Sequence, residues 1–484
     1  MVITRLTKSR FYVRIKRSDF FDTMKHSQKY FFASIVSTGL SFISIPVFTR
    51  LFTREDYGIV SVFNAYLLIF AVLLTANCHS SVGRYYFEEK PDFNEFLGTT
   101  LILVVSVFSV CAFLLLLFYD QIARLMNLPE ILLMFLLFTS FFTIFYDIYL
   151  QILNAQKRSS EYAAISIANG AFTLGLAIIL VLLLAENRYL GRIWASFLVG
   201  IIFSIYCFFK IVRISKFAVK KEHIKYILIF SVPLIPYTLS AVILAFFDRI
   251  FINYTIDSAA AGVYSVGYAV ASLLSMVIAA TQTALMPDFF GFLNRKQYAR
   301  LDSLVSRVFA IVTIAALGLI LFARDIIVIL ADVKFHEGLV VIPIVVIGLV
   351  FYGMYTVYGR YITYMKKNIY VSLVMIFSGI VNIILNVVFI PEYGYIAGAY
   401  TTVVSYFLLF ITTWVVAKRI FKEKMTPLWG LGKSLLIMFG FLGASVVVGS
   451  MVTDVTLIFV IKFVLLVFFC ICVFHRELKR LLSG

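Results

Sequence analysis

The stretch IPVFTRLFTREDYGIVSVFNAY, residues 45–66, links two long apolar runs through a short segment rich in charge. A second stretch, ILAFFDRIFINYTIDSAAAGVYSVGYAV (243–270), has the same plan: an apolar run ending near an arginine, a turn, and a new run that starts at a glycine. Aligned without gaps, YGIVSVFNAY (57–66) and AGVYSVGYAV (261–270) share a glycine, a serine, a valine and an alanine. Because repeated halves are typical of secondary transporters, this repeat predicts a chain built from two related halves.

The composition places both stretches in a membrane protein. Hydrophobic residues make up 62% of the 484 residues and charged residues 14%, and the mean hydropathy is +0.99. Apolar runs of about 20 residues recur along the chain, and each is long enough to cross a bilayer as a helix. The sequence therefore predicts an all-α polytopic membrane protein with about 14 transmembrane helices. The expected spans are 30–48, 59–77, 98–118, 131–153, 162–184, 193–209, 227–251, 263–287, 304–323, 338–358, 370–390, 396–417, 434–451 and 457–473.

The net charge of +17 is explained by topology. If the N-terminus is cytoplasmic, 32 of the 42 lysines and arginines fall in cytoplasmic segments, 7 in outer segments and 3 inside spans. That asymmetry is the positive-inside pattern, so we expect both termini in the cytoplasm and no nucleic-acid partner. Residues 1–29 form a basic cytoplasmic segment, which is interpreted as a helix on the inner leaflet. A signal peptide is the competing interpretation, but the run that follows is as long as a full span, so we expect it to be retained.

The motif content argues against an enzyme. The five cysteines lie in or beside apolar runs, and the five histidines form no H-x-x-x-H pair, so neither a metal site nor a cofactor is expected. The chain has no Walker lysine loop, no H-E-x-x-H and no G-x-S-x-G motif. The outer loops are also short, whereas membrane glycosyltransferases and polymerases usually carry their chemistry in a large outer domain.

The repeat and the charge pattern divide the chain. We expect an N-lobe over 30–209 (spans 1–6), a cationic cytoplasmic linker over 210–226, a C-lobe over 227–417 (spans 7–12), and a region over 418–484 with two extra helices and a cytoplasmic tail. The linker is either a joint between two halves or a cluster of charges that stops membrane insertion. The first span of each lobe carries prolines (Pro46, Pro233 and Pro236), which should bend those helices beside a central cavity.

The motifs in this order resemble a known family. IPVFTRLFTREDYGIVSVF looks like the first hairpin of the oligosaccharide flippases of the polysaccharide biosynthesis protein family. SVPLIPYTLSAVILAFFDRIFINY and AGVYSVGYAV are similar to its seventh and eighth spans, and IPEYGYIAGAYTTVVSY (390–406) is similar to the element before its twelfth span. The resemblance covers nearly the whole chain. It implies the fold of the multidrug/oligosaccharidyl-lipid/polysaccharide exporter superfamily, in which two pseudo-symmetric six-helix lobes surround a cavity and two helices follow.

The resemblance also implies a function. Members of this branch move undecaprenyl-diphosphate-linked repeat units from the inner to the outer leaflet of the cytoplasmic membrane for O-antigen, capsule or exopolysaccharide assembly. The implied partners are the polyprenyl-diphosphate-linked oligosaccharide, membrane lipids, a polysaccharide polymerase and a chain-length regulator. The alternatives are a cation-coupled multidrug exporter or a peptidoglycan lipid-precursor flippase of the same superfamily. A membrane glycosyltransferase or polymerase is a weaker alternative.

Four arginines are candidates for binding a diphosphate, because guanidinium groups match phosphate oxygens in a bidentate geometry. Arg84, at the inner end of span 2, is placed where a lipid headgroup would enter, although it is also a typical positive-inside anchor. Arg50 and Arg249 end the first span of each lobe, where they either guide release or lie at the interface paired with neighbouring acids. Arg360 ends span 10 beside a stripe of tyrosines that suits either sugar stacking or an aromatic belt at the membrane surface.

Two acids are candidates for ion coupling. Asp147 lies inside span 4, and an intramembrane carboxylate is a functional candidate by default. A hydrogen bond from a nearby tyrosine or Gln151 would instead give Asp147 a structural role. Asp248, next to Arg249 in span 7, is the second candidate.

Overall fold

The computed structural model describes residues 36, 39–88, 90–451 and 455–482, and within these ranges every regular element is a helix. The predicted basic segment 1–29 lies outside the described residues. The elements are the helix Gly39–Leu51, α2 (Arg54–Thr75), α3 (Ser80–Phe87), α4 (Phe93–Leu117), α5 (Tyr119–Met126), α6 (Ile131–Ala155), α7 (Ser159–Leu183), α8 (Tyr189–Ile214), α9 (Lys221–Ser231), η1 (Val232–Leu234), α10 (Ile235–Thr255), α11 (Ser258–Ala271), α12 (Leu273–Asn294), α13 (Tyr298–Leu321), α14 (Ala323–Leu330), η2 (Val333–Val340), α15 (Val341–Tyr364), α16 (Asn368–Tyr393), α17 (Tyr395–Ile420), α18 (Leu428–Met451) and α19 (Val455–Leu482).

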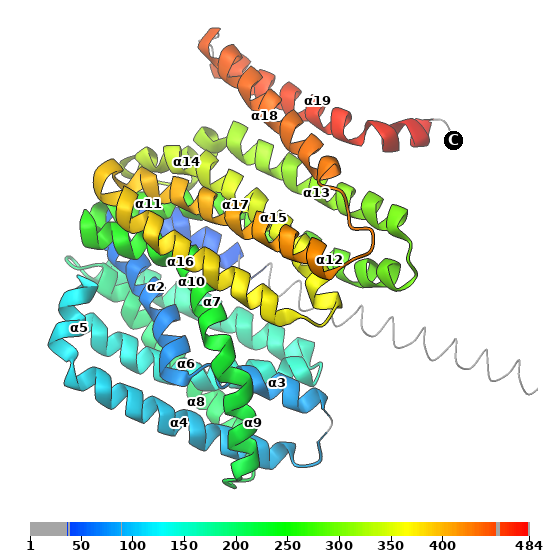
Figure 1. Cartoon of the computed structure of the whole chain (residues 1–484). Coiled ribbons are helices and arrows are strands. Elements are labelled where there is room, and N and C mark those ends of the chain that lie inside the picture. Colours follow the sequence, from blue (N-terminus) through cyan, green and yellow to red (C-terminus); the bar gives the residue numbers. More distant parts are fainter. Residues whose placement is uncertain (1–35, 37–38, 89, 452–454, 483–484) are drawn as a thin grey trace, which may run out of the picture. The chain divides into compact units, whose positions relative to one another are not determined.

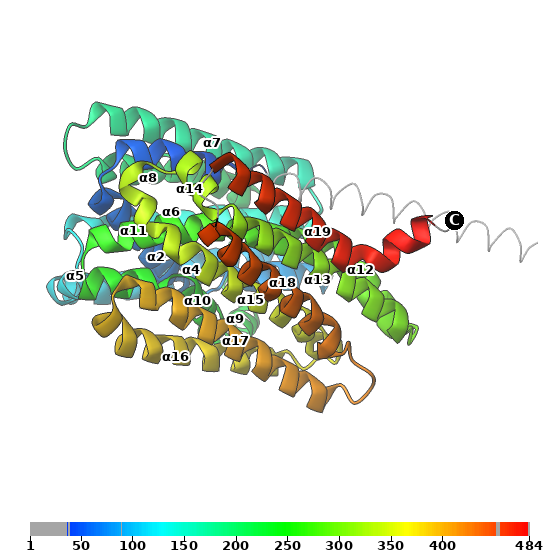
Figure 2. The same cartoon turned by 90° about the horizontal axis from the view of Figure 1, so that it is seen from above.

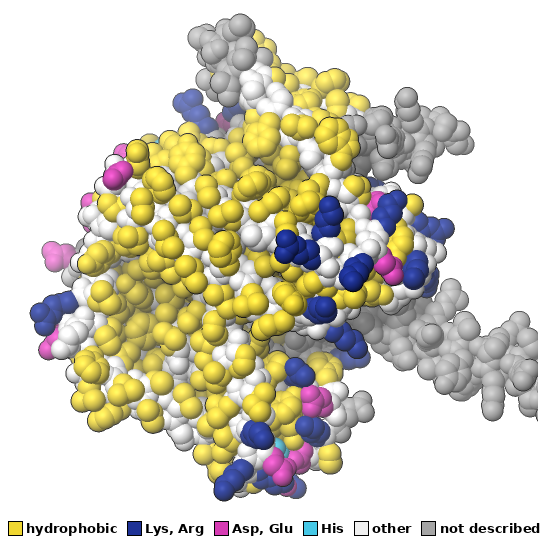
Figure 3. Space-filling model, viewed as in Figure 1, with side chains coloured by type: hydrophobic (Ala, Val, Ile, Leu, Met, Phe, Trp, Pro, Cys, Tyr) yellow, Lys and Arg dark blue, Asp and Glu magenta, His cyan; other side chains and the backbone are white. Residues whose placement is uncertain are grey.

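The prediction of a helical, multi-span membrane protein is confirmed. Among the described residues, 11 helical segments are long and apolar enough to cross a bilayer, and three shorter apolar helices cover Gly39–Leu51, Ser434–Ala444 and Val460–Cys472. The count of 14 spans stays a prediction. Hydrophobic side chains cover large continuous areas of the face drawn in Figure 3, as expected for a surface in contact with lipid. Leu183 of α7 and Ile384 of α16, for instance, have 74% and 55% of their surface exposed, whichever face they lie on.

The chain folds into two compact units whose boundaries fall inside helices. Of the described residues, one unit contains those from 66 to 235 and those up to Ser44, and the other contains 45–65 and those from 236 onward. In the first unit α6 packs against α3 and α8, α7 packs against α8, and α4 packs against α9. In the second unit α15, α16 and α17 form a packed layer, and α13 contacts α12, α15 and α18. Figures 1 and 2 show α16 and α17 side by side along their length.

Prolines lie at two of the unit boundaries. The first boundary falls between Ser44 and Ile45, one residue before Pro46 in the helix Gly39–Leu51, and another falls between Ile235 and Pro236. Between α9 and α10 the helix tightens into the 3₁₀ turn η1, which contains Pro233. Proline has no N–H to continue the helical ladder, which explains why the long apolar segment Lys221–Thr255 is interrupted at this point.

The two copies of the sequence repeat touch each other. The first half of α2 belongs to the same unit as α11, and a Cβ on Gly58 would lie 1.8 Å from the Ser258 carbonyl oxygen. In the same way, a Cβ on Gly262 would lie 2.1 Å from the Arg54 carbonyl oxygen. Each glycine therefore contacts the carbonyl group that lies four residues before the glycine of the other copy. Small residues allow this backbone contact between membrane helices. Arg54 also forms a bidentate ion pair with Glu337 of η2, at 2.9 and 3.1 Å.

Candidate functional site

A group of buried polar side chains surrounds Asp248 of α10. Asp248 has 2% of its surface exposed. Its carboxylate accepts hydrogen bonds from the Tyr264 hydroxyl of α11, from the Arg249 backbone N–H at 2.9 Å, and from the Thr402 hydroxyl of α17 at 3.5 Å. Three helices that are separate in the sequence therefore converge on one carboxylate.

A chain of neutral oxygens and amides continues from this carboxylate between α16 and α17. Thr401 and Thr402 both donate to the Gly398 carbonyl, at 2.9 and 2.8 Å, and the Thr401 hydroxyl also contacts the Asn386 side-chain oxygen. The Asn386 amide donates to Asn382 at 3.2 Å. The Asn382 amide in turn donates to Ser405, at 3.1 Å. The two asparagines lie four residues apart, so the helix places them on one face, toward α17.

The charge balance of this cluster determines what it can bind. Among the described residues, no lysine or arginine lies within ion-pair distance of Asp248, and the Arg249 guanidinium instead lies over the rings of Phe246 and Tyr268, at 4.7 and 4.4 Å. A buried, unpaired carboxylate is costly unless a cation or a proton neutralises it. Carboxylate, amide, hydroxyl and carbonyl oxygens are hard ligands, so one carboxylate among several of them suits a small cation of single charge or a proton.

Transition-metal chemistry has no comparable group of ligands. In the parts of the chain that the structure describes, no three His, Cys, Asp or Glu side chains lie close enough to hold a metal ion. The described cysteines, including Cys78 and Cys207, are free thiols.

The candidate arginines of the second unit differ in how their guanidinium groups are satisfied. Arg50 donates to the carbonyls of Pro46 at 2.7 Å and Ile329 at 3.5 Å. Arg360, half-buried in α15, donates through Nη2 to the Gln282 carbonyl at 2.5 Å. Among the described atoms, its Nη1, the Gln282 side-chain oxygen and Arg249 Nε are buried without a hydrogen-bond partner. Buried polar atoms are usually hydrogen-bonded, so these groups of the second unit have hydrogen-bonding capacity left for a ligand.

The tyrosine stripe beside Arg360 is a core feature. Tyr355 and Tyr358 have 6% and 0% of their surface exposed. The Tyr358 hydroxyl donates to the Thr426 carbonyl at 3.0 Å, and Tyr361 bonds the Thr426 hydroxyl and N–H at 2.9 and 3.1 Å. These rings therefore anchor the segment between α17 and α18, and their faces are covered by protein.

The remaining two candidates lie in the first unit, on helices that pack together. Arg84 of α3 is exposed over 59% of its side chain, bonds Glu88 at 3.4 Å and lies over the Phe230 ring at 4.8 Å. Asp147 of α6 is half-buried. The helices α3 and α6 pack together: a Cβ added to Gly83 of α3 would lie 3.5 Å from the side-chain oxygen of Gln151 of α6. Gln151 lies one helical turn from Asp147.

Glu88 shows how the surroundings of Arg84 are set electrostatically. Its carboxylate accepts from the Tyr226 hydroxyl at 2.7 Å and pairs with Lys90 at 3.2 Å. The hydrogen bond from Tyr226, followed by that from Lys90, holds the pKa of Glu88 below its usual range. Glu88 is therefore ionised at neutral pH and available to hold the Arg84 guanidinium.

Asp248 is apparent as a candidate in the sequence, whereas the side chains around it are not. Tyr264, Asn382, Asn386, Thr401 and Thr402 are all buried inside apolar helices. One signal was available, because polar residues at intervals of three or four in a membrane span mark an interior face. Which spans share that face depends on packing that the sequence does not state.

Comparison with known proteins adds a family and a fold. Residues 25–293 match the family model described as polysaccharide biosynthesis protein. A relative named Lsg locus putative protein 1, from Haemophilus influenzae, is 24% identical over 400 residues, which is 79% of this chain and 97% of the relative. Among solved structures, "Lipid II flippase MurJ, inward closed conformation" matches with a TM-score of 0.75 and 16% identity, over 93% of this chain and 99% of that one. An inward-facing multidrug resistance MATE family transporter of the MOP superfamily matches with a TM-score of 0.63 and 15% identity, over 80% and 95%.

Proposed function

Because the chain belongs to the polysaccharide biosynthesis protein family, we propose that it is a flippase for polyprenyl-diphosphate-linked oligosaccharides. It would move undecaprenyl-diphosphate-linked repeat units from the inner to the outer leaflet of the cytoplasmic membrane, for assembly of O-antigen, capsule or exopolysaccharide. The family match carries the proposal. The likeness in fold to a lipid II flippase supports it, since the substrate in that protein's name is also lipid-linked.

The chemistry of the cargo explains the candidate cations. A diphosphate cannot enter hydrocarbon without partners, because an unpaired buried charge costs many kcal/mol. Arg84 offers an exposed guanidinium that Glu88 and Phe230 hold in place. Arg360 offers a buried Nη1 without a partner, beside an equally unpartnered oxygen of Gln282. In this proposal Arg84 receives the diphosphate on the cytoplasmic side, while Arg360, Arg249 and Arg50 contact it later in the cycle.

The cluster around Asp248 supports coupling of transport to a monovalent cation or a proton. The carboxylate is buried, forms no ion pair within 4.0 Å among the described residues, and adjoins the hydroxyl of Thr402 and the side-chain oxygens beyond it. Binding a cation there would draw α10, α11 and α17 together. Because α10 starts directly after the proline-containing turn η1, this turn would serve as the hinge for a movement of α10. Asp147 is a second candidate in the first unit.

The membrane orientation is part of the proposal. Both termini would be cytoplasmic, in the inner membrane, with residues 252–262 and 324–337 outside. Single cysteines at Asp257 and at Lys422, in a cysteine-free background, should react with an impermeant maleimide at Asp257 alone in intact cells. Labelling of Lys422→Cys from outside would invert the orientation.

The decisive experiment identifies the lipid that accumulates in a cell lacking the protein. We expect completed repeat units to remain on undecaprenyl diphosphate in the inner leaflet and surface polymer to disappear. Loss of a polymerase would instead leave single units on the outer leaflet, where a polymerase and a chain-length regulator would otherwise use them. Intact polymer with altered dye efflux would refute the flippase function and favour a multidrug exporter. Accumulation of peptidoglycan precursor would favour the lipid II branch.

A further inference from the structure

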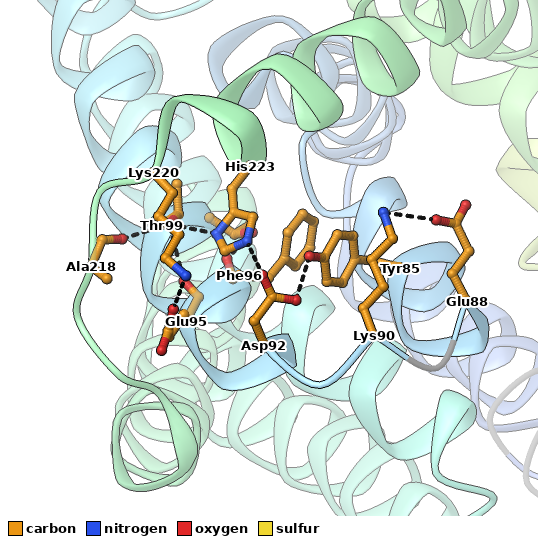
Figure 4. Close-up of polar contacts among 11 residues, drawn as sticks. Tyr85, Glu88, Lys90, Asp92, Glu95, Phe96, Thr99, Ala218, Lys220 and His223 are labelled. Atoms are coloured by element: carbon orange, nitrogen blue, oxygen red, sulfur yellow. Dashed lines mark hydrogen bonds and ion pairs between the residues drawn. The ribbon is translucent and has the colours of Figure 1, made fainter.

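The segment between α8 and α9 is fixed to the N-terminal end of α4 by a dense set of polar contacts, shown in Figure 4. The Lys216 N–H donates to the Asn94 carbonyl at 2.8 Å, and the Thr99 hydroxyl donates to the Ala218 carbonyl at 2.5 Å. A Cβ on Gly98 would lie 2.2 Å from the Lys216 carbonyl oxygen, so only glycine permits this approach. The predicted cationic linker is therefore packed onto the first unit over this length.

His223, near the start of α9, is the centre of these contacts. It has 2% of its surface exposed and packs against the rings of Phe96 and Tyr85, at 5.5 and 5.7 Å. Its Nε2 lies 2.7 Å from Asp92 Oδ2, and its Nδ1 lies 3.2 Å from the Thr99 hydroxyl oxygen. Figure 4 shows the ring between these two partners.

The hydrogen-bond partners of this ring suit its doubly protonated form. The Thr99 hydroxyl has one proton, and its neighbours Ala218 O and Glu95 O, at 2.5 and 3.0 Å, can only accept it. With that proton directed at the Ala218 carbonyl, the hydroxyl oxygen accepts from His223 Nδ1, while the ionised Asp92 accepts from Nε2. In this arrangement both ring nitrogens donate, which is the pattern of an imidazolium.

Asp92 is suited to hold that charge. It also accepts from the Tyr85 hydroxyl at 2.7 Å. This hydrogen bond, followed by the one from His223, holds the pKa of Asp92 below its usual range, so the carboxylate is ionised at neutral pH. The other charges facing the ring are already paired: Glu95 with Lys220, and Glu88 with Lys90 and Arg84. An imidazole side chain gains or loses a proton near neutral pH, so comparing two pH values tests this contact.

The same short helix supplies the surroundings of Arg84. One turn beyond His223, the Tyr226 hydroxyl donates to Glu88 Oε1, the oxygen that Arg84 Nε also contacts. One turn further, the Phe230 ring lies under the guanidinium. Since α9 packs against both α3 and α4, its position decides whether Glu88 and Phe230 can hold Arg84.

We propose that protonated His223, bound between Asp92 and Thr99, is a positioning residue for Arg84: it fixes α9 so that Tyr226 and Phe230 hold the guanidinium ready for a diphosphate. Loss of the proton removes one hydrogen bond and the ion pair, which loosens α9 and weakens diphosphate binding. This inference rests on the proposed role of Arg84.

The test uses purified full-length protein and farnesyl diphosphate as the probe, with binding measured by thermal stabilisation at pH 6.0 and pH 8.5. We expect H223Q to weaken binding about tenfold at pH 6.0, as loss of a charged hydrogen bond typically does. The ratio of wild-type to H223Q affinity should fall toward one at pH 8.5. Because the charge of the probe changes with pH equally for both proteins, that change does not affect the ratio. D92N should reproduce the loss. H336Q, the same change at a histidine of η2, should bind like the wild type.

A second readout separates this inference from the proposed function. Hydrogen–deuterium exchange of residues 216–230 should be faster in H223Q than in the wild type at pH 6.0, with less difference at pH 8.5. If R84A binds the probe normally, the role of Arg84 is wrong, whatever the exchange shows. If R84A loses binding while H223Q and D92N bind like the wild type with an unchanged pH profile, the positioning role of His223 is wrong. A lower melting temperature of H223Q with normal affinity would also overturn it, since that is the effect of a purely structural residue.

Discussion

Replacing Gly58 or Gly262 with alanine should separate α2 from α11. The added Cβ would lie 1.8 Å from the Ser258 oxygen in Gly58→Ala and 2.1 Å from the Arg54 oxygen in Gly262→Ala. To reach an ordinary contact of about 3.4 Å, the opposing backbone must retreat by roughly 1.6 or 1.3 Å. Neither neighbour is a flexible side chain, so the helices themselves must move.

The cost follows from the packing. Overfilling a close-packed contact typically costs about 1–3 kcal/mol. Because about 1.4 kcal/mol corresponds to a factor of ten, each substitution should favour the separated arrangement of these helices by roughly one to two orders of magnitude. The two substitutions act on one contact, so the double variant should shift the equilibrium by less than the sum of the single effects.

The assay is the reactivity of one buried cysteine. Val62 of α2 and Val266 of α11 each have 0% of their surface exposed, so a cysteine at either position reports separation. In a cysteine-free background, maleimide labelling of Val266→Cys should be about ten times faster with Gly58→Ala, as expected for a roughly tenfold larger open population.

The matched control is Gly291→Ala, because a Cβ at Gly291 of α12 meets no atom within 4 Å. Its labelling rate should equal that of the parent. Unchanged labelling in both Gly58→Ala and Gly262→Ala would show that the helices do not rely on this contact.

Three further outcomes follow from the site and its surroundings. Arg84→Ala should abolish complementation of a deletion strain at normal protein levels, whereas Arg84→Lys should retain part of it, because lysine lacks the bidentate fork; full activity of Arg84→Ala would make it an anchor only. Replacing sodium with choline, or raising the pH, should lower the melting temperature of the wild type but not that of Asp248→Asn, and Asp147→Asn is the comparison in the other unit. An unchanged response of Asp248→Asn to the ions would exclude Asp248 as the coupling site. The stabilising contribution of Asp92, whose folded-state pKa is depressed, should persist above its unfolded pKa and disappear only as pH falls through the lower folded value. An Asp92→Asn variant that loses stability equally at pH 3 and pH 6 would contradict this.

The sequence predicted the features that depend on local patterns. Span length and hydropathy specify the helices, and the prolines at positions 233 and 236 specify the interruption before α10, because each effect acts within one segment. The repeat also identified Gly58 and Gly262 as equivalent. That they touch was not predictable, since the contact joins residues about two hundred positions apart.

The candidate site was predicted only in part for the same reason. Asp248 is conspicuous as an acid in an apolar run, but Thr402 and Asn386 come from other helices and become partners only through tertiary packing. Arg84 was identified from its position, yet the groups that hold it include Phe230, which follows the predicted linker. His223 gave no sequence signal, because a single histidine in a basic segment resembles an ordinary surface residue.

The most direct test of the flippase function uses purified protein in proteoliposomes. The vesicles carry undecaprenyl-diphosphate-linked oligosaccharide with a fluorescent sugar label in both leaflets, and dithionite quenches the outer leaflet only. With active protein, quenching should proceed from about half of the label to nearly all of it as inner lipids reach the outside. Arg84→Ala vesicles should stop at about half, as should protein-free vesicles. Quenching that stops at half with folded wild-type protein, with or without a sodium or proton gradient, would contradict the account.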